Sequence, residues 1–241
     1  MNQYGGSSYQ PQMSPSQLGV RPAAALSTAF LSQAFLWMFL GLLVTTGVGF
    51  WIASLSDAQL SEVAGIFLPL LIGQLVVAMV LSFAIRSMSA TLGLLLFFVY
   101  SAITGVTVGF LLLSYPPSTV AAAGLSSAAV FGGAAIYGGV TKRDLTSMGA
   151  YVFMALIGLI VAMLVNLFLQ SATFGYVISG IAVLIFTALT AYDIQRIQRG
   201  DVAAWAGTME KGAVMGAFRL YLDFINLFFA LLNIFGGGGR R

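Results

Sequence analysis

The sequence LYLDFINLFFALLNIF, residues 220–235, is almost wholly apolar but contains Asp223, and Arg219 directly precedes it. A charged carboxylate is costly in hydrocarbon, so it is expected to face the interior of a helix bundle and to have a function. A second acid in an apolar context is Asp193, in the sequence TALTAYDIQRIQ. We therefore predict a C-terminal helix at the centre of a membrane bundle, with Asp193 as the partner of its aspartate.

The composition supports a membrane location for the whole chain. Of its 241 residues, 59% are hydrophobic and only 7% are charged, and the mean hydropathy is +0.98. Soluble domains contain about 25% charged residues. The strands of a membrane barrel would alternate apolar and polar residues, whereas these apolar runs are continuous and of helical length. The predicted class is an all-α integral membrane protein.

The residue types that are missing exclude several kinds of site. The chain has no cysteine and no histidine. Disulfides, thiolate nucleophiles, the serine–histidine triad and histidine-ligated metal centres are therefore excluded. No tightly bound cofactor is expected. The ten basic residues lie at the ends of predicted helices, which indicates membrane topology rather than nucleic-acid binding.

Seven apolar segments have roughly the 20 residues that are needed to cross a bilayer. They lie near residues 30–54, 64–85, 90–114, 119–141, 148–170, 174–195 and 213–235. We expect six of these helices to surround the seventh, within a membrane domain at residues 25–236. Residues 1–24 have the composition of a disordered tail without a cleavable signal peptide, and residues 237–241 are expected to form a flexible tail.

The loops separate by charge. One set contains Asp57 and Glu62 but no basic residue. The other set carries Arg21, Arg86, Lys142, Arg143, Arg196, Arg199 and Lys211. By the positive-inside rule, this second side and the N-terminus are cytoplasmic. The length of residues 220–235 favours a complete seventh span, whereas Arg240 and Arg241 favour a re-entrant segment that returns them to the cytoplasm.

The rise per residue places four charged groups at similar depth. Asp193 lies roughly 27 Å from the outer end of its helix, and Asp223 roughly 20 Å from the outer face. Arg86 ends the second segment on the cytoplasmic side, and Arg219 lies one turn before Asp223. Local pairing is an alternative: Asp193 with Arg196 and Asp223 with Arg219. Arg86 could equally extend to the lipid headgroups.

If the two aspartates meet, they are expected to share a proton, because two like charges cannot both ionise cheaply in a low dielectric. Loss of that proton would add repulsion and open the layer, with Arg86 acting as a latch. Two carboxylates also suit a transient Ca²⁺ ion, which prefers hard oxygen ligands. Three asparagines, Asn166, Asn226 and Asn233, are expected to make interhelical hydrogen bonds or else to line a pore.

The sequence AYDIQRI and the ending LYLDFINLFFALLNIFG resemble the Bax inhibitor-1 family of transmembrane Bax-inhibitor-motif proteins, over about residues 25–236. The resemblance implies six helices around a central seventh and a pH-sensitive Ca²⁺ leak across the membrane. It also implies a sensor formed by Asp193 and Asp223, with the latch arginine falling on Arg86. The chain ends in GGGGRR rather than in the lysine-rich tail of animal members, so their tail-dependent regulation is not carried over. The absence of cysteine and the compact loops favour a bacterial member in an inner membrane.

Three functions remain possible at this stage. The first is a Ca²⁺ leak channel or a proton-coupled Ca²⁺ exchanger, gated by Asp193 and Asp223. The second is a non-transporting modulator that binds a membrane protease or channel, a role that the resemblance to bacterial members of the family also implies. The third is an intramembrane aspartyl protease, but the GxGD and Pro-Ala-Leu motifs of that class are absent. We therefore expect a protein that is not an enzyme and whose partners are lipid, Ca²⁺ and protons.

Overall fold

The computed structural model describes residues 24–237, which are almost entirely helical and contain no strand. Seven of the helices in this range are long and apolar enough to cross a membrane. They are α1 (Ala24–Ala53), α3 (Phe67–Ala84), α4 (Ala90–Ser114), α5 (Pro117–Val140), α6 (Thr146–Leu169), α7 (Ala172–Gln198) and α9 (Met209–Phe235). The predicted all-α membrane class is confirmed. The tails predicted at 1–24 and 237–241 lie almost wholly outside the described residues.

Two short helices were not predicted. Helix α2 (Asp57–Gly65) follows α1, and its start is fixed by Ser56, whose backbone N–H donates to the Gln59 side chain. Helix α8 (Asp201–Ala206) lies between α7 and α9, flanked by Gly200 and Gly207. Both glycines have positive φ, 77° and 95°, a region that other residues rarely adopt. Both helices are too short to be found from apolar runs of membrane-spanning length.

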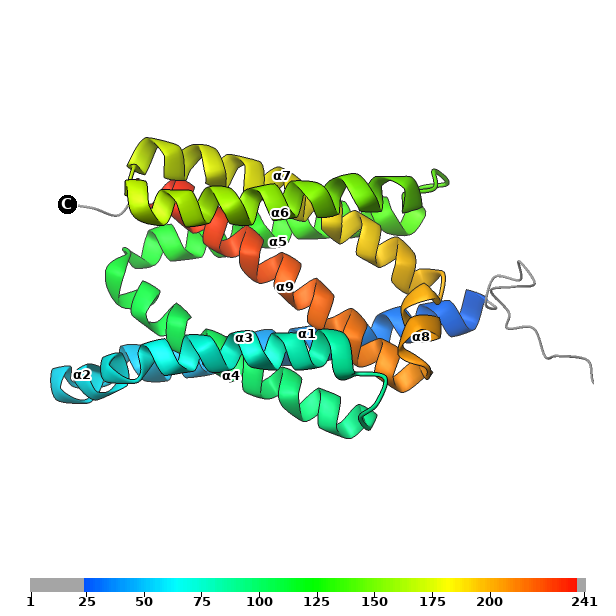
Figure 1. The fold of residues 1–241 in the computed structure, drawn as a ribbon, viewed down its shortest axis with the longest axis horizontal. Coiled ribbons are helices and arrows are strands. Elements are labelled where there is room, and N and C mark those ends of the chain that lie inside the picture. The colour runs from blue at the N-terminus through cyan, green and yellow to red at the C-terminus, as the bar shows by residue number, and fades with distance from the viewer. Residues whose placement is uncertain (1–23, 238–241) are drawn as a thin grey trace, which may run out of the picture.

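The spanning helices form two groups of three, joined by α9. Helices α1, α3 and α4 pack together, as do α5, α6 and α7, and α9 runs diagonally between the two groups (Figure 1). Helix α9 packs against α1, α4, α5, α7 and α8. The stricter prediction, a C-terminal helix surrounded by all six others, is not confirmed, because α3 packs mainly on α4 and α6 mainly on α7.

Helix α9 runs the whole length of the bundle. Its first residues lie beside the short helix α8 and beside the end of α3, where the Lys211 ammonium donates to the Arg86 carbonyl at 2.9 Å. At its other end, the Asn233 amide donates to Ser179 Oγ at 2.8 Å, near the start of α7. Residues 209–235 are therefore one continuous helix that does not turn back within the bundle, and it is long enough for the complete span that its length predicted.

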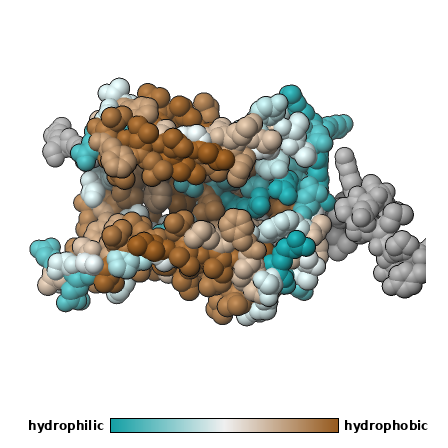
Figure 2. All heavy atoms as spheres, in the orientation of Figure 1, coloured by the Kyte–Doolittle hydropathy of each residue, from teal (hydrophilic) through white to brown (hydrophobic). Residues whose placement is uncertain are grey.

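The two ends of the bundle differ in polarity. The loop between α5 and α6, the end of α7 and the start of α9 carry the basic residues, and we call this the basic end. Figure 2 shows hydrophilic residues gathered at this end, while the sides of the molecule are apolar. The opposite end holds the α4–α5 and α6–α7 connections. This asymmetry agrees with the charge pattern used to predict a cytoplasmic N-terminus, which stays a prediction.

Helices α1 and α4 approach closely because glycines lie between them. A Cβ added at Gly105 would lie 2.6 Å from Val48 Cβ and 2.8 Å from the Thr45 carbonyl oxygen. In lipid, such close backbone approach is a main source of helix association. The Thr45 hydroxyl adds a polar link, because it donates to the Ser101 carbonyl at 2.8 Å and contacts Tyr221 Oη at 2.5 Å. One side chain thus joins α1, α4 and α9.

Replacing Gly105 by leucine is expected to separate α1 from α4 and to destabilise the bundle by about 1–3 kcal/mol, the usual cost of overpacking. The measurement is the unfolding temperature in detergent. The folded protein that remains after heating is quantified by size-exclusion chromatography with tryptophan fluorescence. Gly47→Leu is the matched control, because no atom lies within 4 Å of a Cβ at that position. Equal loss of stability in both variants would contradict this account of the α1–α4 interface.

Candidate functional site

The two aspartates that the sequence singled out lie in the buried part of the bundle, on α7 and α9. Asp193 is 5% exposed and Asp223 is 4% exposed. The two side chains are close enough for the charge of Asp193 to act on the carboxyl group of Asp223. The depths estimated from the helix rise therefore correctly predicted that these two residues lie near each other. Their helices pack extensively against each other.

Arg219 makes an ion pair across the α7–α9 interface. Its Nη1 lies 3.1 Å from Asp193 Oδ1, and the side chains are 32% and 7% exposed. The charge of Arg219 also acts on Asp223, one turn further along the same helix. Among the described residues, neither local alternative, Asp193 with Arg196 or Asp223 with Arg219, forms an ion pair. Arg219 is instead the charge partner of Asp193.

Asp223 has an unusual carboxyl group. Its Oδ2 atom is buried and has no hydrogen-bond partner, and it is the one such side-chain atom among the described residues. A buried polar atom without a partner is costly and calls for an explanation, such as a catalytic or transport role or a missing water or ion. Asp223 is therefore the strongest indication of function in the described part of the chain.

Both aspartates and Arg219 line a cavity of about 640 Å³, which we call the aspartate cavity. Most of its wall is apolar, from α6, α7 and α9, with Ser82 contributed by α3. The side chain of Arg196 also lines it and lies over the Tyr192 ring, 5.5 Å from its centroid. The cavity provides the space in which a proton or an ion could reach the two carboxyl groups.

Arg86, the predicted latch, lies elsewhere. Its side chain is exposed just beyond the end of α3 and does not line the aspartate cavity. No ion pair joins it to either aspartate in residues 24–237. The latch stays a prediction for another state of the protein, whereas in this state Arg219 is the cation at the pair.

Ca²⁺ would meet few ligands here. No group of three or more acidic, histidine or cysteine side chains that could hold a metal occurs among the described residues. Ca²⁺ takes six to eight oxygen ligands, so two carboxylates can bind it only with water or backbone oxygens in the remaining positions. This donor set suits an ion that passes through rather than one that stays.

The asparagines follow different patterns. Asn233 makes the predicted interhelical hydrogen bond, to Ser179 on α7. Asn166 accepts from the Ser171 backbone N–H across the α6–α7 turn. For Asn226 the expectation of an interhelical bond is wrong, because its amide donates to the Leu222 carbonyl of its own helix at 2.8 Å. Asn226 lines the aspartate cavity instead.

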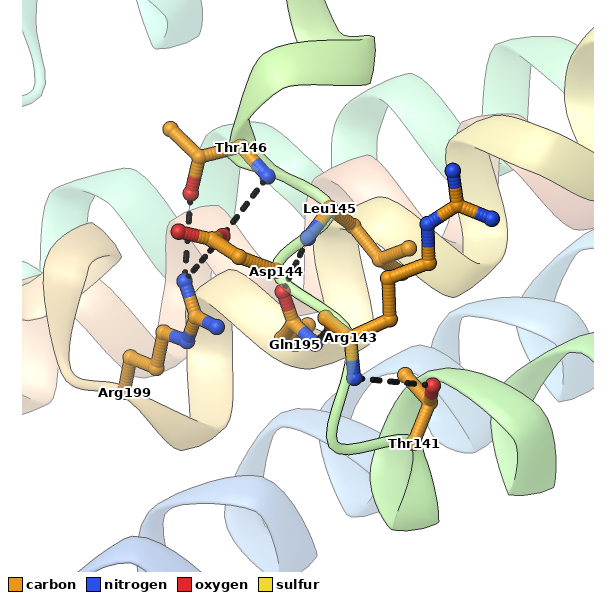
Figure 3. A network of polar contacts seen from close by, with 7 residues as sticks. All are labelled: Thr141, Arg143, Asp144, Leu145, Thr146, Gln195 and Arg199. Atoms are coloured by element: carbon orange, nitrogen blue, oxygen red, sulfur yellow. Dashed lines mark hydrogen bonds and ion pairs between the residues drawn. The ribbon is translucent and has the colours of Figure 1, made fainter.

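A polar clamp at the basic end was missed by the sequence analysis (Figure 3). Gln195 is buried on α7, where its Oε1 accepts from the Leu145 backbone N–H and its Nε2 donates to the Arg143 carbonyl, both at 2.9 Å. Arg199 extends the clamp by donating to Asp144 at 2.6 Å. The only sequence signal was a glutamine two residues after Asp193. The clamp fixes the helix that carries Asp193 against the α5–α6 loop.

Gln195→Ala is expected to free this loop and to cost about 1–3 kcal/mol, because the buried Leu145 N–H loses its acceptor. Hydrogen exchange measured by mass spectrometry should accelerate in residues 141–148. Gln198→Ala, one turn further along α7, is the control and should leave the exchange of that segment unchanged. Unchanged exchange in Gln195→Ala would show that the clamp does not hold the loop.

Asp144 of this clamp is not a sensor of neutral pH. The hydrogen bonds from the Thr146 backbone and side chain, followed by Arg199, hold the pKa of Asp144 below its usual value of 3.8. A lowered folded pKa contributes stability above the unfolded pKa, and that stability is lost only as the pH falls through the folded value. A pH response near neutrality must therefore originate elsewhere.

Comparison with known proteins identifies the family. A family model described as inhibitor of apoptosis-promoting Bax1 matches residues 27–240. The chain belongs to this family, the Bax inhibitor-1 family. The prediction made from the two C-terminal motifs is confirmed.

Several bacterial proteins are similar to this chain. The inner membrane protein YbhL of Escherichia coli K12 is 41% identical over 90% of this chain and 94% of its own length. A protein of Deinococcus radiodurans is 41% identical over 85% of this chain and 89% of its own. A membrane protein of Streptococcus pyogenes serotype M1 is 46% identical over 68% of this chain and 71% of its own length. These similarities and the seven apolar helices agree with an integral protein of a bacterial inner membrane, and none of the names indicates an enzyme.

Proposed function

We propose that this Bax inhibitor-1 family member is a pH-sensitive leak pathway for Ca²⁺, gated by Asp193 and Asp223. The observation that carries the proposal is the buried Asp223 Oδ2, which has no partner and belongs to a carboxyl group that lines a cavity. This Oδ2 atom can take up and release a proton or bind a cation without losing a hydrogen bond of its own.

The ion pair of Asp193 supplies the switch. While Asp223 is protonated, Asp193 is the one charged carboxyl group of the pair, and it lies beside Arg219 with Arg196 also near it. Once Asp223 releases its proton, a second negative charge appears beside Asp193 in a low dielectric, where like charges repel strongly. Arg219 is shared between them, and the helices α7 and α9 are expected to move apart. Ca²⁺ is the cation that neutralises both carboxylates, so flux is expected to rise with pH.

The test is Ca²⁺ uptake into proteoliposomes that contain the purified protein, compared with empty liposomes, over a series of pH values. The proposal expects uptake above that of empty liposomes and an increase as the pH rises. A countermovement of protons that follows Ca²⁺ would identify an exchanger rather than a leak. Uptake equal to that of empty liposomes at every pH would overturn the proposal.

A second candidate is a non-transporting modulator that binds a membrane protease or channel. Helices α3 and α6 favour it, because nearly all of their side chains face outward and could meet another membrane protein as well as lipid. Co-purification of such a partner with the full chain, together with no Ca²⁺ uptake by the purified protein, would favour this candidate. Uptake by the purified protein alone would favour the leak pathway.

A further inference from the structure

A second cavity continues the polar face of α9 beyond the aspartates. It measures about 270 Å³ and lies at the end of the bundle opposite the basic end, and we call it the asparagine cavity. Its polar lining comes from Asn166, Ser179, Asn226 and Asn233. Positions 223, 226 and 233 are three and seven residues apart, so they share one face of α9. The aspartates are thus one part of a longer polar stripe.

The two cavities meet at a thin partition. Met163, Phe186 and Asn226 line both of them. The aspartate cavity begins at Gly149 of α6, and the asparagine cavity reaches Asn166 of the same helix. These residues are about 26 Å apart along α6 at 1.5 Å per residue, which is most of a ~30 Å hydrocarbon core. The residues that line the two cavities together therefore extend over most of this thickness, and the three shared residues lie between the cavities.

The chemistry of the asparagine cavity suits a hydrated cation. No acidic or basic side chain lines it, so its polar lining is neutral amide and hydroxyl. Amide nitrogens are turned toward the protein: Asn233 Nδ2 donates to Ser179 Oγ and to the Gly175 carbonyl, and Asn226 Nδ2 donates to the Leu222 carbonyl. The amide oxygens of Asn226 and Asn233 are then the groups left for a ligand, and carbonyl oxygens are ligands that Ca²⁺ prefers.

We propose that the two cavities are halves of one water-accessible route for a hydrated cation along α9, closed in this state by Phe186 and Met163 with Asn226 between the halves. This inference rests on the proposed function for the identity of the cation. Phe186 is 6% exposed and projects from α7, the helix that carries Asp193. Movement of α7 away from α9 at the aspartates would therefore also withdraw Phe186 and open the partition.

Cysteine accessibility tests the route without depending on Ca²⁺ flux. The natural chain has no cysteine, so each introduced thiol is the only one. Asn226→Cys, Asn233→Cys and Ser179→Cys are expected to react with a charged, membrane-impermeant thiol reagent at least about tenfold faster than Leu184→Cys, because the reactive thiolate needs water. Leu184 is the matched control: it is on α7 close to Phe186, and its side chain is 72% exposed on the apolar exterior.

The result that would overturn the route is modification of Asn226→Cys and Asn233→Cys no faster than that of Leu184→Cys. Ser179 accepts a hydrogen bond, so if its variant fails to fold, these two asparagine variants decide the question. In flux assays, Phe186→Ala should raise Ca²⁺ uptake about tenfold, because removal of the ring lowers the barrier to cation passage at the partition. Asn226→Leu should lower it by a similar factor.

The two kinds of assay separate the two claims. Fast labelling of the cavity cysteines without Ca²⁺ uptake by the wild type would uphold the route and overturn the proposed function. Ca²⁺ uptake by the wild type without labelling would uphold the function and overturn the route.

Discussion

Replacing Asp223 by asparagine is expected to remove most of the pH dependence of Ca²⁺ flux. In the wild type, release of one proton from the buried aspartate layer should change flux by about tenfold across roughly two pH units. Asparagine keeps the size of the side chain but can neither ionise nor repel Asp193. The measurement is Ca²⁺ uptake into proteoliposomes over the same pH series for both proteins. At every pH, flux in the variant should stay near the level that the wild type shows at acid pH.

Asp57→Asn is the matched control, because it makes the same chemical change on the exposed helix α2. It should leave both the flux and its pH response unchanged. A wild-type pH response in Asp223→Asn would contradict the assignment of this carboxyl group as the sensor. If Asp57→Asn also lost the pH response of Ca²⁺ flux, the response would not be specific to the buried aspartates.

The second large effect is on stability, at the ion pair between Asp193 and Arg219. Removing either partner leaves the other charge in apolar surroundings, so Asp193→Asn and Arg219→Gln should each destabilise the protein, and the double variant by less than the sum. We expect a coupling energy of about 1–3 kcal/mol in a double-mutant cycle, the range for residues in direct contact. Unfolding temperatures in detergent, with tryptophan fluorescence as the signal, give the four values that are needed.

The chain offers a control pair of the same residue types. Arg199 and Asp144 are 2.6 Å apart, closer than Arg219 and Asp193, and the two arginines are similarly exposed, but the Asp144 side chain is 67% exposed and that of Asp193 only 7%. Exposed ion pairs contribute little, because water and salt screen them. The Asp144–Arg199 cycle should therefore give a much smaller coupling energy than the buried pair. Equal coupling in the two cycles would mean that burial does not strengthen the Asp193–Arg219 pair.

The positions of the spanning helices were predictable because the bilayer requires a nearly continuous apolar run. The segment expected at residues 90–114 is α4 to the residue. Helix α1 begins six residues before the predicted start at residue 30, and every other predicted end lies within four residues of the observed one. Helices α2 and α8 were missed because they depend on local caps and on glycines with positive φ. The division into two groups of three was also not predictable, because an apolar run gives no information on which face meets which neighbour.

The depth of the candidate-site residues in the bundle was predictable, but the direction in which their side chains point was not. Counting residues along each helix correctly brought Asp193, Asp223 and Arg219 into one layer. The same counting placed Arg86 there, yet Arg86 lies just beyond the end of α3, a helix of the other group, and its side chain is exposed at the basic end. The function of Gln195 depends on a loop 50 residues earlier in the chain, which no local pattern reveals.

The most direct test of the central claim, that Asp193 and Asp223 share a proton in one state and separate in another, is the distance between their carboxyl groups in structures determined at acid and at alkaline pH. The account predicts a separation near hydrogen-bonding distance at acid pH and a longer one at alkaline pH. A separation above about 8 Å in both structures would contradict it, because two carboxyl groups must be close to share a proton.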